Sequence, residues 1–271
     1  MCLLLFALDA HPRHRLVVAA NRDEVTERPA APLGWWADAP AVLAGRDLEA
    51  NGTWMGVTRD GRWAALTNVR EPKVGDSHPK NPRPARRSRG DLVAGFLAGA
   101  ETAEAAAARV HAERDAYDGF NLVLRDGAST WSVSTRTDAP AELGPGVYGL
   151  SNDVLDTPWP KVVRGKAALR AALAADPVTP DALLDLLRDD RPAPDDALPD
   201  TGVGLAWERT LSPAFIVAEG YGTRVSTALT LGRDGHVEVA ERTWRAGGAE
   251  GETRREAFET EPAPPARQRS R

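Results

Sequence analysis

The sequence predicts an α+β fold in which antiparallel sheets are covered by amphipathic helices. Short apolar runs bounded by turn residues recur along the chain, and two helical stretches divide them into three groups. Each helical stretch has an apolar face, and the strands are apolar enough to need covering. The order of strands, helices, strands, helices and strands therefore favours antiparallel sheets with helices packed outside them.

The opening residues predict a β-hairpin. Residues 2–8 and 16–20 are apolar runs of strand length, and the polar segment between them contains Pro12. If the turn is centred near Pro12, the residue numbers of cross-strand partners sum to about 24. This register fixes which residues face the start of the chain.

The hairpin brings the only cysteine of the chain against polar residues, because Cys2 is then opposite Arg22 and beside Asn21 and Asp23. Removal of Met1 is expected before a residue as small as cysteine. The exposed α-amine and the thiol have ordinary pKa values of about 8 and about 8.5, so the amine can take the thiol proton. Arg22 would favour the thiolate, and Asp23 would orient the ammonium. The alternative is a buried cysteine that only packs at a strand start.

The remaining elements follow from the same signals. Further strands are expected at residues 41–44, 54–58, 62–69, 120–125, 130–135, 147–151, 214–218, 223–231 and 237–244. Helices are expected at residues 88–98, 101–117, 158–175 and 182–188, with Ser88 and Thr179 as caps. Irregular loops are expected at residues 25–40, 70–87 and 190–210.

The chain shows no internal linker, so residues 1–245 are expected to form a single domain. Residues 246–271 are charged, contain prolines and have few apolar side chains. Such a composition buries too little apolar surface to fold, and it predicts a disordered tail.

Several sequence blocks resemble the NRDE family, which is named for the tetrapeptide at residues 21–24 and is also called the transport and Golgi organisation protein 2 family. The other matching blocks are Met1-Cys2 before an apolar strand, Gly52–Thr58, Ala65–Arg70, Ser88–Gly90, Phe120–Leu122, Gly149–Asn152 and Tyr221–Arg224. The resemblance implies an N-terminal-nucleophile (Ntn) hydrolase-like fold, a four-layer α/β/β/α sandwich of two antiparallel sheets, similar to penicillin V acylase and bile salt hydrolase. It also implies links to haem trafficking and to acyl-coenzyme A or lipid metabolism.

Similarity to the cholylglycine hydrolase branch implies roles for two amides and a distal arginine. Asn68 and Asn152 match the amides and Arg224 the arginine, although both asparagines can instead form Asx-type turns. In this chain Arg22 and Asp23 are adjacent, so they point to opposite faces of a strand unless a bulge or strand end intervenes. The expected catalytic set is Cys2, Arg22, Asp23, Asn68, Asn152 and Arg224.

A second set of residues is expected to bind the substrate. Trp35 and Trp36 either line a pocket or cover the edge of the core. Lys80, Arg83, Arg86, Arg87 and Arg89 lie in one loop and can clamp the phosphates of coenzyme A or the propionates of haem, or simply be solvated. The expected binding set is Asn21, Trp35, Trp36, Arg86, Arg87 and Arg89.

Composition narrows the class of function. The net charge is −5, so nucleic acid is not an expected partner, and no apolar run approaches the ~20 residues of a membrane span. One cysteine and no signal-peptide pattern lead us to expect a cytoplasmic protein. The five histidines have no metal-ligand spacing, so no metal or required cofactor is expected.

Two hypotheses of function follow, and a third is less specific. The first is a Cys2 hydrolase of a non-peptide amide C–N bond. The second is a non-catalytic protein that binds and moves haem or an acyl-coenzyme A-like amphiphile. The third is a scaffold for protein partners, for which the sequence offers no positive feature.

Overall fold

The computed structural model describes residues 2–70 and 86–261. They form two sheets, whose strands are listed here in their order across each sheet. Sheet A consists of β10 (Gly146–Leu150), β1 (Cys2–Leu8), β2 (His14–Val25), β12 (Tyr221–Gly232), β13 (His236–Trp244) and β14 (Glu250–Glu259), with β11 (Val217–Ala218) paired to β12. Sheet B consists of β3 (Ala30–Trp35), β4 (Val42–Asp47), β5 (Met55–Thr58), β6 (Trp63–Asn68), β7 (Phe120–Arg125), β8 (Thr130–Ser134) and β9 (Ala141–Glu142).

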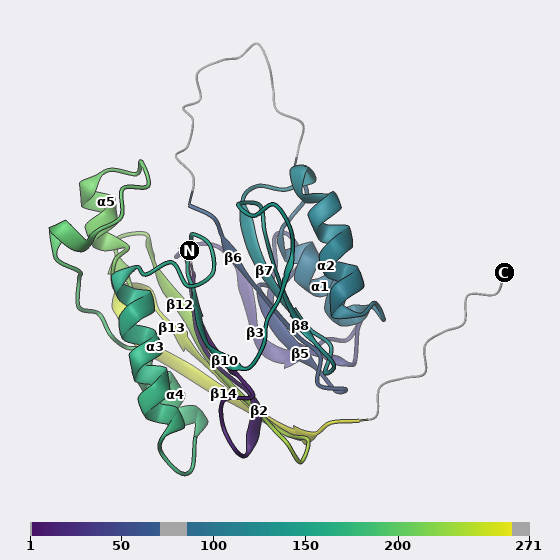
Figure 1. The fold of residues 1–271 in the computed structure, drawn as a ribbon. Coiled ribbons are helices and arrows are strands. Elements are labelled where there is room, and N and C mark those ends of the chain that lie inside the picture. Colours follow the sequence, from purple (N-terminus) through teal and green to yellow (C-terminus); the bar gives the residue numbers. More distant parts are fainter. Residues whose placement is uncertain (1, 71–85, 262–271) are drawn as a thin grey trace.

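Helices cover the outer face of each sheet (Figure 1). The α-helices are α1 (Gly90–Ala98), α2 (Ala103–Ala112), α3 (Pro160–Leu173), α4 (Pro180–Leu186) and α5 (Leu205–Thr210). Short 3₁₀ turns are found at Arg114–Ala116, Asp195–Ala197 and Ala246–Gly248. Helices α1 and α2 pack on sheet B, and α3 and α4 pack on sheet A.

Three apolar clusters define four layers. The central cluster lies between the sheets, where Phe6 of β1 meets Trp63 of β6 with ring centroids 5.6 Å apart. A second cluster lies between sheet B and its helices, around Phe96, and a third lies between sheet A and its helices, around Leu169. The paired strands of both sheets are antiparallel. The expected α/β/β/α sandwich of two antiparallel sheets is therefore confirmed.

The opening hairpin has the register predicted from the sequence. Cys2 pairs with Arg22, and Leu4 pairs with Ala20. Side chains alternate along β1, so Leu4 and Phe6 belong to the inter-sheet cluster whereas Leu3 belongs to the cluster under α3 and α4. By the same alternation Cys2 faces the space between the sheets.

The expected disordered tail is wrong for part of its length, because residues 250–259 form β14 along the free edge of β13. This strand is mostly exposed and charged, and its main apolar anchor is Phe258, whose ring meets Trp35 edge-on at 5.1 Å. Backbone pairing and this one contact stabilise a segment whose composition resembles that of a disordered chain. Residues 262–271 lie outside the described residues.

Two expected loops also contain regular structure. Residues 30–35 form β3, an edge strand whose pairing with β4 is interrupted by an irregularity between Ala31 and Gly34. Residues 205–210 form α5, a short helix that begins after Gly204. The N-cap of α1 is Arg89 rather than Ser88, and its side chain makes no capping hydrogen bond. None of the helices within the described residues is long and apolar enough to span a membrane.

Candidate functional site

A cavity of about 510 Å³ opens beside Cys2, where the hairpin reaches the end of the inter-sheet space. Its size is in the range of ordinary small-molecule pockets. Cys2, Arg22 and Val225 form one row across three neighbouring strands of sheet A, and all three line the cavity. The residue pairing predicted from the sequence therefore places the thiol at a concave surface.

The Cys2 side chain is almost completely buried, with 6% of its surface exposed. Burial raises the pKa of the Cys2 thiol, while the charge of Arg22 and a hydrogen bond from the backbone of Asp23 favour the thiolate. The net effect is a raised pKa, so the thiol of Cys2 is protonated at rest. A nucleophilic role for this thiol therefore requires a nearby base.

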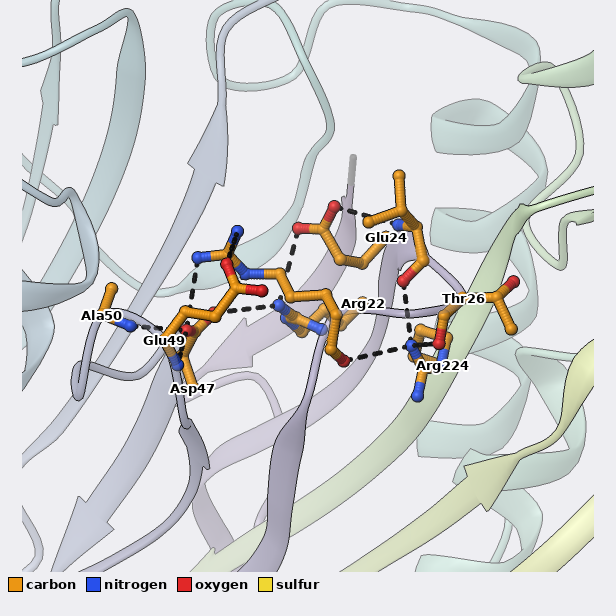
Figure 2. A network of polar contacts seen from close by, with 9 residues as sticks. Arg22, Glu24, Thr26, Asp47, Glu49, Ala50 and Arg224 are labelled. Carbon is orange, nitrogen blue, oxygen red and sulfur yellow. Dashed lines mark hydrogen bonds and ion pairs between the residues drawn. The ribbon is translucent and has the colours of Figure 1, made fainter.

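Arg22 belongs to a polar network on the cavity wall (Figure 2). Its guanidinium lies 3.5 Å from a carboxylate oxygen of Glu24 and 3.5 Å from one of Asp47. Asp47 also accepts a 2.5 Å hydrogen bond from Arg28 and bonds from two backbone N–H groups of the following turn. These carboxylates fix the arginine beside the thiol and offset part of its charge.

Asp23 points away from the inter-sheet space, toward the layer of α3. Its Oδ1 accepts a 2.7 Å hydrogen bond from the Thr223 hydroxyl, and the residue is 1% exposed. Burial raises the pKa of the Asp23 carboxyl, and the positive charge of Lys161 opposes that rise. Arg22 and Asp23 thus occupy opposite faces of β2, although both contribute to the cavity lining.

Lys161 is a buried group that sequence reasoning missed. It lies in the first turn of α3, is 2% exposed, and donates from Nζ to the Leu211 carbonyl at 3.0 Å. Burial lowers the pKa of Lys161 to about 8, against the charge of Asp23. A lysine at a buried helix position in an apolar surrounding was the available signal.

A buried ion pair lies close to Lys161. Arg70 follows β6 and donates to Glu208 of α5 at 2.6 Å, and both side chains are at most 5% exposed. Glu208 also accepts bonds from the backbone and hydroxyl of Thr201, at 2.8 and 2.6 Å. This pair joins the end of sheet B to the helical layer of sheet A.

The two expected amides are adjacent but occupy different positions. Asn68 lines the cavity at the end of β6. Asn152 is 1% exposed and donates from Nδ2 to the Asn68 carbonyl at 2.8 Å. Its Oδ1 accepts from Ser151, whose hydroxyl is also 3.0 Å from the Cys2 carbonyl. Asn152 therefore fixes the backbone of Asn68, Ser151 contacts the backbone of Cys2, and Asn152 does not line the cavity itself.

Arg224 and Asn21, also expected at the site, do not line the cavity. Arg224 is the extra residue of a β-bulge in β12, and it donates to the carbonyls of Val25 and Thr26 at 2.9 and 2.5 Å (Figure 2). Asn21 is fully buried and donates to the Leu187 carbonyl at 3.0 Å and to a second carbonyl at 2.8 Å. Both side chains stabilise backbone around the site.

Trp35 and Trp36 also lie outside the cavity lining. The Trp35 indole N–H donates to Glu256 of β14 at 3.3 Å, and the guanidinium of Arg59 covers its ring at 3.9 Å. Trp36 packs in the cluster under α1 and α2 and donates to the Ala44 carbonyl. The alternative interpretation, that they cover the edge of the core, describes both.

The described part of the basic loop forms one wall of the cavity. Arg86, Arg87 and Arg89 line it beside the start of α1. Arg87 pairs with Glu113 at 3.0 Å, and Arg89 donates to the Gly119 carbonyl at 3.0 Å. Lys80 and Arg83 lie outside the described residues.

Glu241 also lines the cavity, and it is a second residue that the sequence analysis missed. Glu241 is 3% exposed and lies on β13, in the inward-facing row that also contains Val237 and Val239. A charged residue that continues an apolar row of alternating positions was the signal for it. No group of three or more His, Cys, Asp or Glu side chains within the described residues is arranged to hold a metal ion.

The fold is an α/β/β/α sandwich in which two helix-covered antiparallel sheets present the cysteine of the first strand at a cavity. The chain belongs to the transport and Golgi organisation 2 family, whose model matches residues 1–246. It is 34% identical over 266 residues to the transport and Golgi organization protein 2 homolog of Bos taurus, covering 90% of this chain and 93% of that protein. The Homo sapiens homolog is also 34% identical, over 265 residues, with the same coverage. The Drosophila melanogaster protein is 28% identical over 273 residues, covering 90% of this chain and 92% of that protein.

Two solved structures are similar at low sequence identity. A Caenorhabditis elegans N-acylethanolamine-hydrolyzing acid amidase ortholog is 12% identical, with a TM-score of 0.45, and the match covers 80% of this chain and 100% of that one. A mutant conjugated bile acid hydrolase from Clostridium perfringens is 10% identical, with a TM-score of 0.47, and the match covers 96% and 92%.

Proposed function

We propose that the protein is an N-terminal-nucleophile hydrolase in which Cys2, exposed at the terminus by removal of Met1, cleaves a non-peptide amide C–N bond. The observation that carries the proposal is the position of the Cys2 thiol, which faces the inter-sheet space and lines a cavity of about 510 Å³ beside Arg22. A cysteine that only packed against the start of a strand would not require a cavity beside its sulfur.

The reaction follows from the groups around the thiol. The Cys2 sulfur attacks the amide carbon while its own α-amine takes the thiol proton, since burial raises the pKa of the thiol and keeps it protonated at rest. The amine then gives that proton to the leaving nitrogen, and the C–N bond breaks. Water, deprotonated by the same amine, hydrolyses the resulting thioester and releases the acid.

The negative charge that develops on the carbonyl oxygen of the substrate needs a hydrogen-bond donor. Asn68 lines the cavity, and Asn152 holds the Asn68 carbonyl at 2.8 Å, so the first amide donates to the oxyanion and the second positions it. Removing one such donor costs about 3 kcal/mol in transition-state stabilisation. Arg22 favours the thiolate by charge.

The proposal is tested by separating the thiol from the terminal amine. Insertion of a lysine between Met1 and Cys2 retains Met1 and keeps the thiol, but it removes the cysteine α-amine. Intact mass establishes which residue begins each purified protein, and release of amine is then measured on a panel of acyl amides. We expect the unmodified protein to turn over at least one amide of the panel. The insertion variant and Cys2→Ser should show no turnover. Retained Met1 in the parent, or unchanged turnover in Cys2→Ser, would refute the proposal.

A second candidate function is binding and transport of an anionic amphiphile such as haem or an acyl-coenzyme A. The observation that favours it is the wall of Arg86, Arg87 and Arg89, because guanidinium groups bind carboxylates and phosphates. None of the described histidines lines this cavity, so these residues would hold propionates without an imidazole ligand for iron. Titration of haem and of an acyl-coenzyme A, followed by tryptophan fluorescence, tests this function. The absence of a saturable change with either ligand would exclude it.

A further inference from the structure

The reaction proposed above gives no role to Glu241, a buried carboxyl of the cavity. Glu241 is 3% exposed, and it lines the same cavity as Cys2. Its Oε1 accepts a 2.7 Å hydrogen bond from the Leu33 backbone N–H, and the Thr227 hydroxyl lies 3.4 Å from Oε2. Within the described residues, Oε2 therefore accepts only this one long hydrogen bond.

Neither neighbouring arginine forms an ion pair with this carboxyl in the part of the chain that the structure describes. Arg22 is held by Glu24 and Asp47, and Arg254 lies 3.3 Å from Glu252. Burial raises the pKa of the Glu241 carboxyl, whereas the Leu33 N–H and the charges of Arg22 and Arg254 oppose that rise. A buried carboxyl in this position is stabilised by any further donor that enters the cavity.

Gly45 of β4 leaves the space above the carboxyl open. A Cβ atom at this position would lie 3.6 Å from Oε2 and 3.7 Å from Oε1 of Glu241, and 3.2 Å from the Ala31 carbonyl. Gly45 lines the same cavity. The glycine therefore exposes the Glu241 oxygens to a bound molecule.

The strand register gives the separation between the carboxyl and the thiol. Leu4 pairs with Ala20, Ala20 with Thr227, and Thr227 with Glu241, so Glu241 is three strands away from β1. It is also two residues further along the sheet than the row of Cys2. With ordinary strand spacing and rise, the two Cα positions are about 16 Å apart, on the same face of sheet A.

We propose that Glu241 is a specificity-determining residue that binds a hydrogen-bond donor, hydroxyl or ammonium, at the far end of an elongated amide substrate. The inference rests on the proposed function of Cys2 and adds the class of substrate to it. The substrate spans about 16 Å, the length of four to five residues of extended backbone. A carboxylate at the same end is rejected, because it would meet Glu241 with like charge.

The test uses thiol alkylation, because the chain has one cysteine. The probes are iodoacetamide and N-alkyl iodoacetamides with linear arms of graded length that end in methyl, hydroxyl, ammonium or carboxylate. Each forms an S–C bond to Cys2 and releases iodide, and the thiol proton goes to the buffer. The rate is followed by intact mass and divided by the iodoacetamide rate of the same variant.

In the unmodified protein, long arms ending in hydroxyl or ammonium should react at least tenfold faster than methyl arms, and carboxylate arms more slowly. Glu241→Gln retains the acceptor for Leu33 and should reduce the preference to less than threefold. Gly45→Ala should do the same without altering the carboxyl, so the result does not depend on one variant folding. Glu238→Gln, on the opposite face of β13, is the matched control and should keep the preference.

Equal rates for all long arms in the unmodified protein would overturn the inference, as would a preference that survives in both Glu241→Gln and Gly45→Ala. Failure of the proposed function is detected separately, as retained Met1 or as unchanged acyl-amide turnover in Cys2→Ser. Should iodoacetamide not react with Cys2, the arms are tested by binding instead of alkylation. In that case unreactive N-alkyl acetamides with the same arms are titrated by tryptophan fluorescence. Tighter binding of the ammonium or hydroxyl arms that is lost in Glu241→Gln supports the assignment, and equal binding refutes it.

Discussion

The ion pair between Arg70 and Glu208 should be costly to break from one side. Its atoms are 2.6 Å apart, and the two side chains are 5% and 4% exposed. In Glu208→Gln one amide oxygen still accepts the bonds of Thr201, but the amide N–H₂ then faces the guanidinium. Breaking a buried pair from one side leaves an uncompensated charge and costs about 3–5 kcal/mol. We expect the free energy of unfolding to fall by that amount.

The same helix provides the control. Arg209 pairs with Asp195 at 2.5 Å, but both side chains are more than half exposed, so Arg209→Gln should lower the free energy of unfolding far less than Glu208→Gln does. Replacing both buried charges, as Arg70→Met with Glu208→Gln, should recover most of the loss, because no unpaired charge remains and the amide oxygen still accepts from Thr201.

Urea unfolding at fixed pH and salt, followed by tryptophan fluorescence, gives the three free energies. Comparison is valid where the slopes with urea agree between variants. A loss in Glu208→Gln no larger than that of Arg209→Gln would refute the reasoning. So would a double variant that is less stable than Glu208→Gln, since the cost would then come from lost packing rather than from an isolated charge.

Three further predictions concern stability. The pKa of Lys161 is about 8 in the fold against an ordinary 10.5, so the unfolded chain binds more protons between these values. Stability of the unmodified protein relative to Lys161→Met should therefore rise by about 3 kcal/mol from pH 8 to pH 10.5, and a flat difference between the two urea curves would contradict this. Asn21→Ala leaves two buried carbonyls and the Ser226 hydroxyl without their partner and should cost roughly 3 kcal/mol in the same assay, whereas a loss below 1 kcal/mol would show that water replaces the amide. Deletion of residues 250–271 uncovers the edge of β13 and the ring of Trp35, so a lower thermal midpoint and concentration-dependent aggregation by light scattering are expected, and an unchanged midpoint would show that β14 contributes nothing.

The sequence predicted the elements whose signals are local. β7 has the expected limits of Phe120 and Arg125, and each end of β5 and β6 lies within one residue of expectation. It did not predict β14, because an exposed edge strand is stabilised by backbone pairing and needs few apolar residues. It missed α5 because six residues in a loop rich in proline and aspartate carry too short a pattern.

The residues of the candidate site also fall into those that local sequence signals predicted and those that they did not. Cys2 and Arg22 were placed together because the hairpin that joins them is local and its register can be counted. Glu241 and Lys161 come from β13 and α3, and their proximity to the site depends on the order of strands in sheet A. That order brings β12 against β2 across about two hundred residues, and a single sequence contains no pairing signal of that range.

The bulge in β12 determines which side chain shares the row of Cys2 and Arg22 across sheet A. Asp23 pairs with Thr223 and Arg22 pairs with Val225, so Arg224 is passed over in the ladder. Were the ladder regular from Thr223 onward, Arg224 would occupy the position of Val225 and bring a further guanidinium to the cavity beside Arg22. Because of this one-residue offset, the strand presents the apolar side chain of Val225 to the cavity, and Arg224 instead binds the backbone carbonyls at the end of β2.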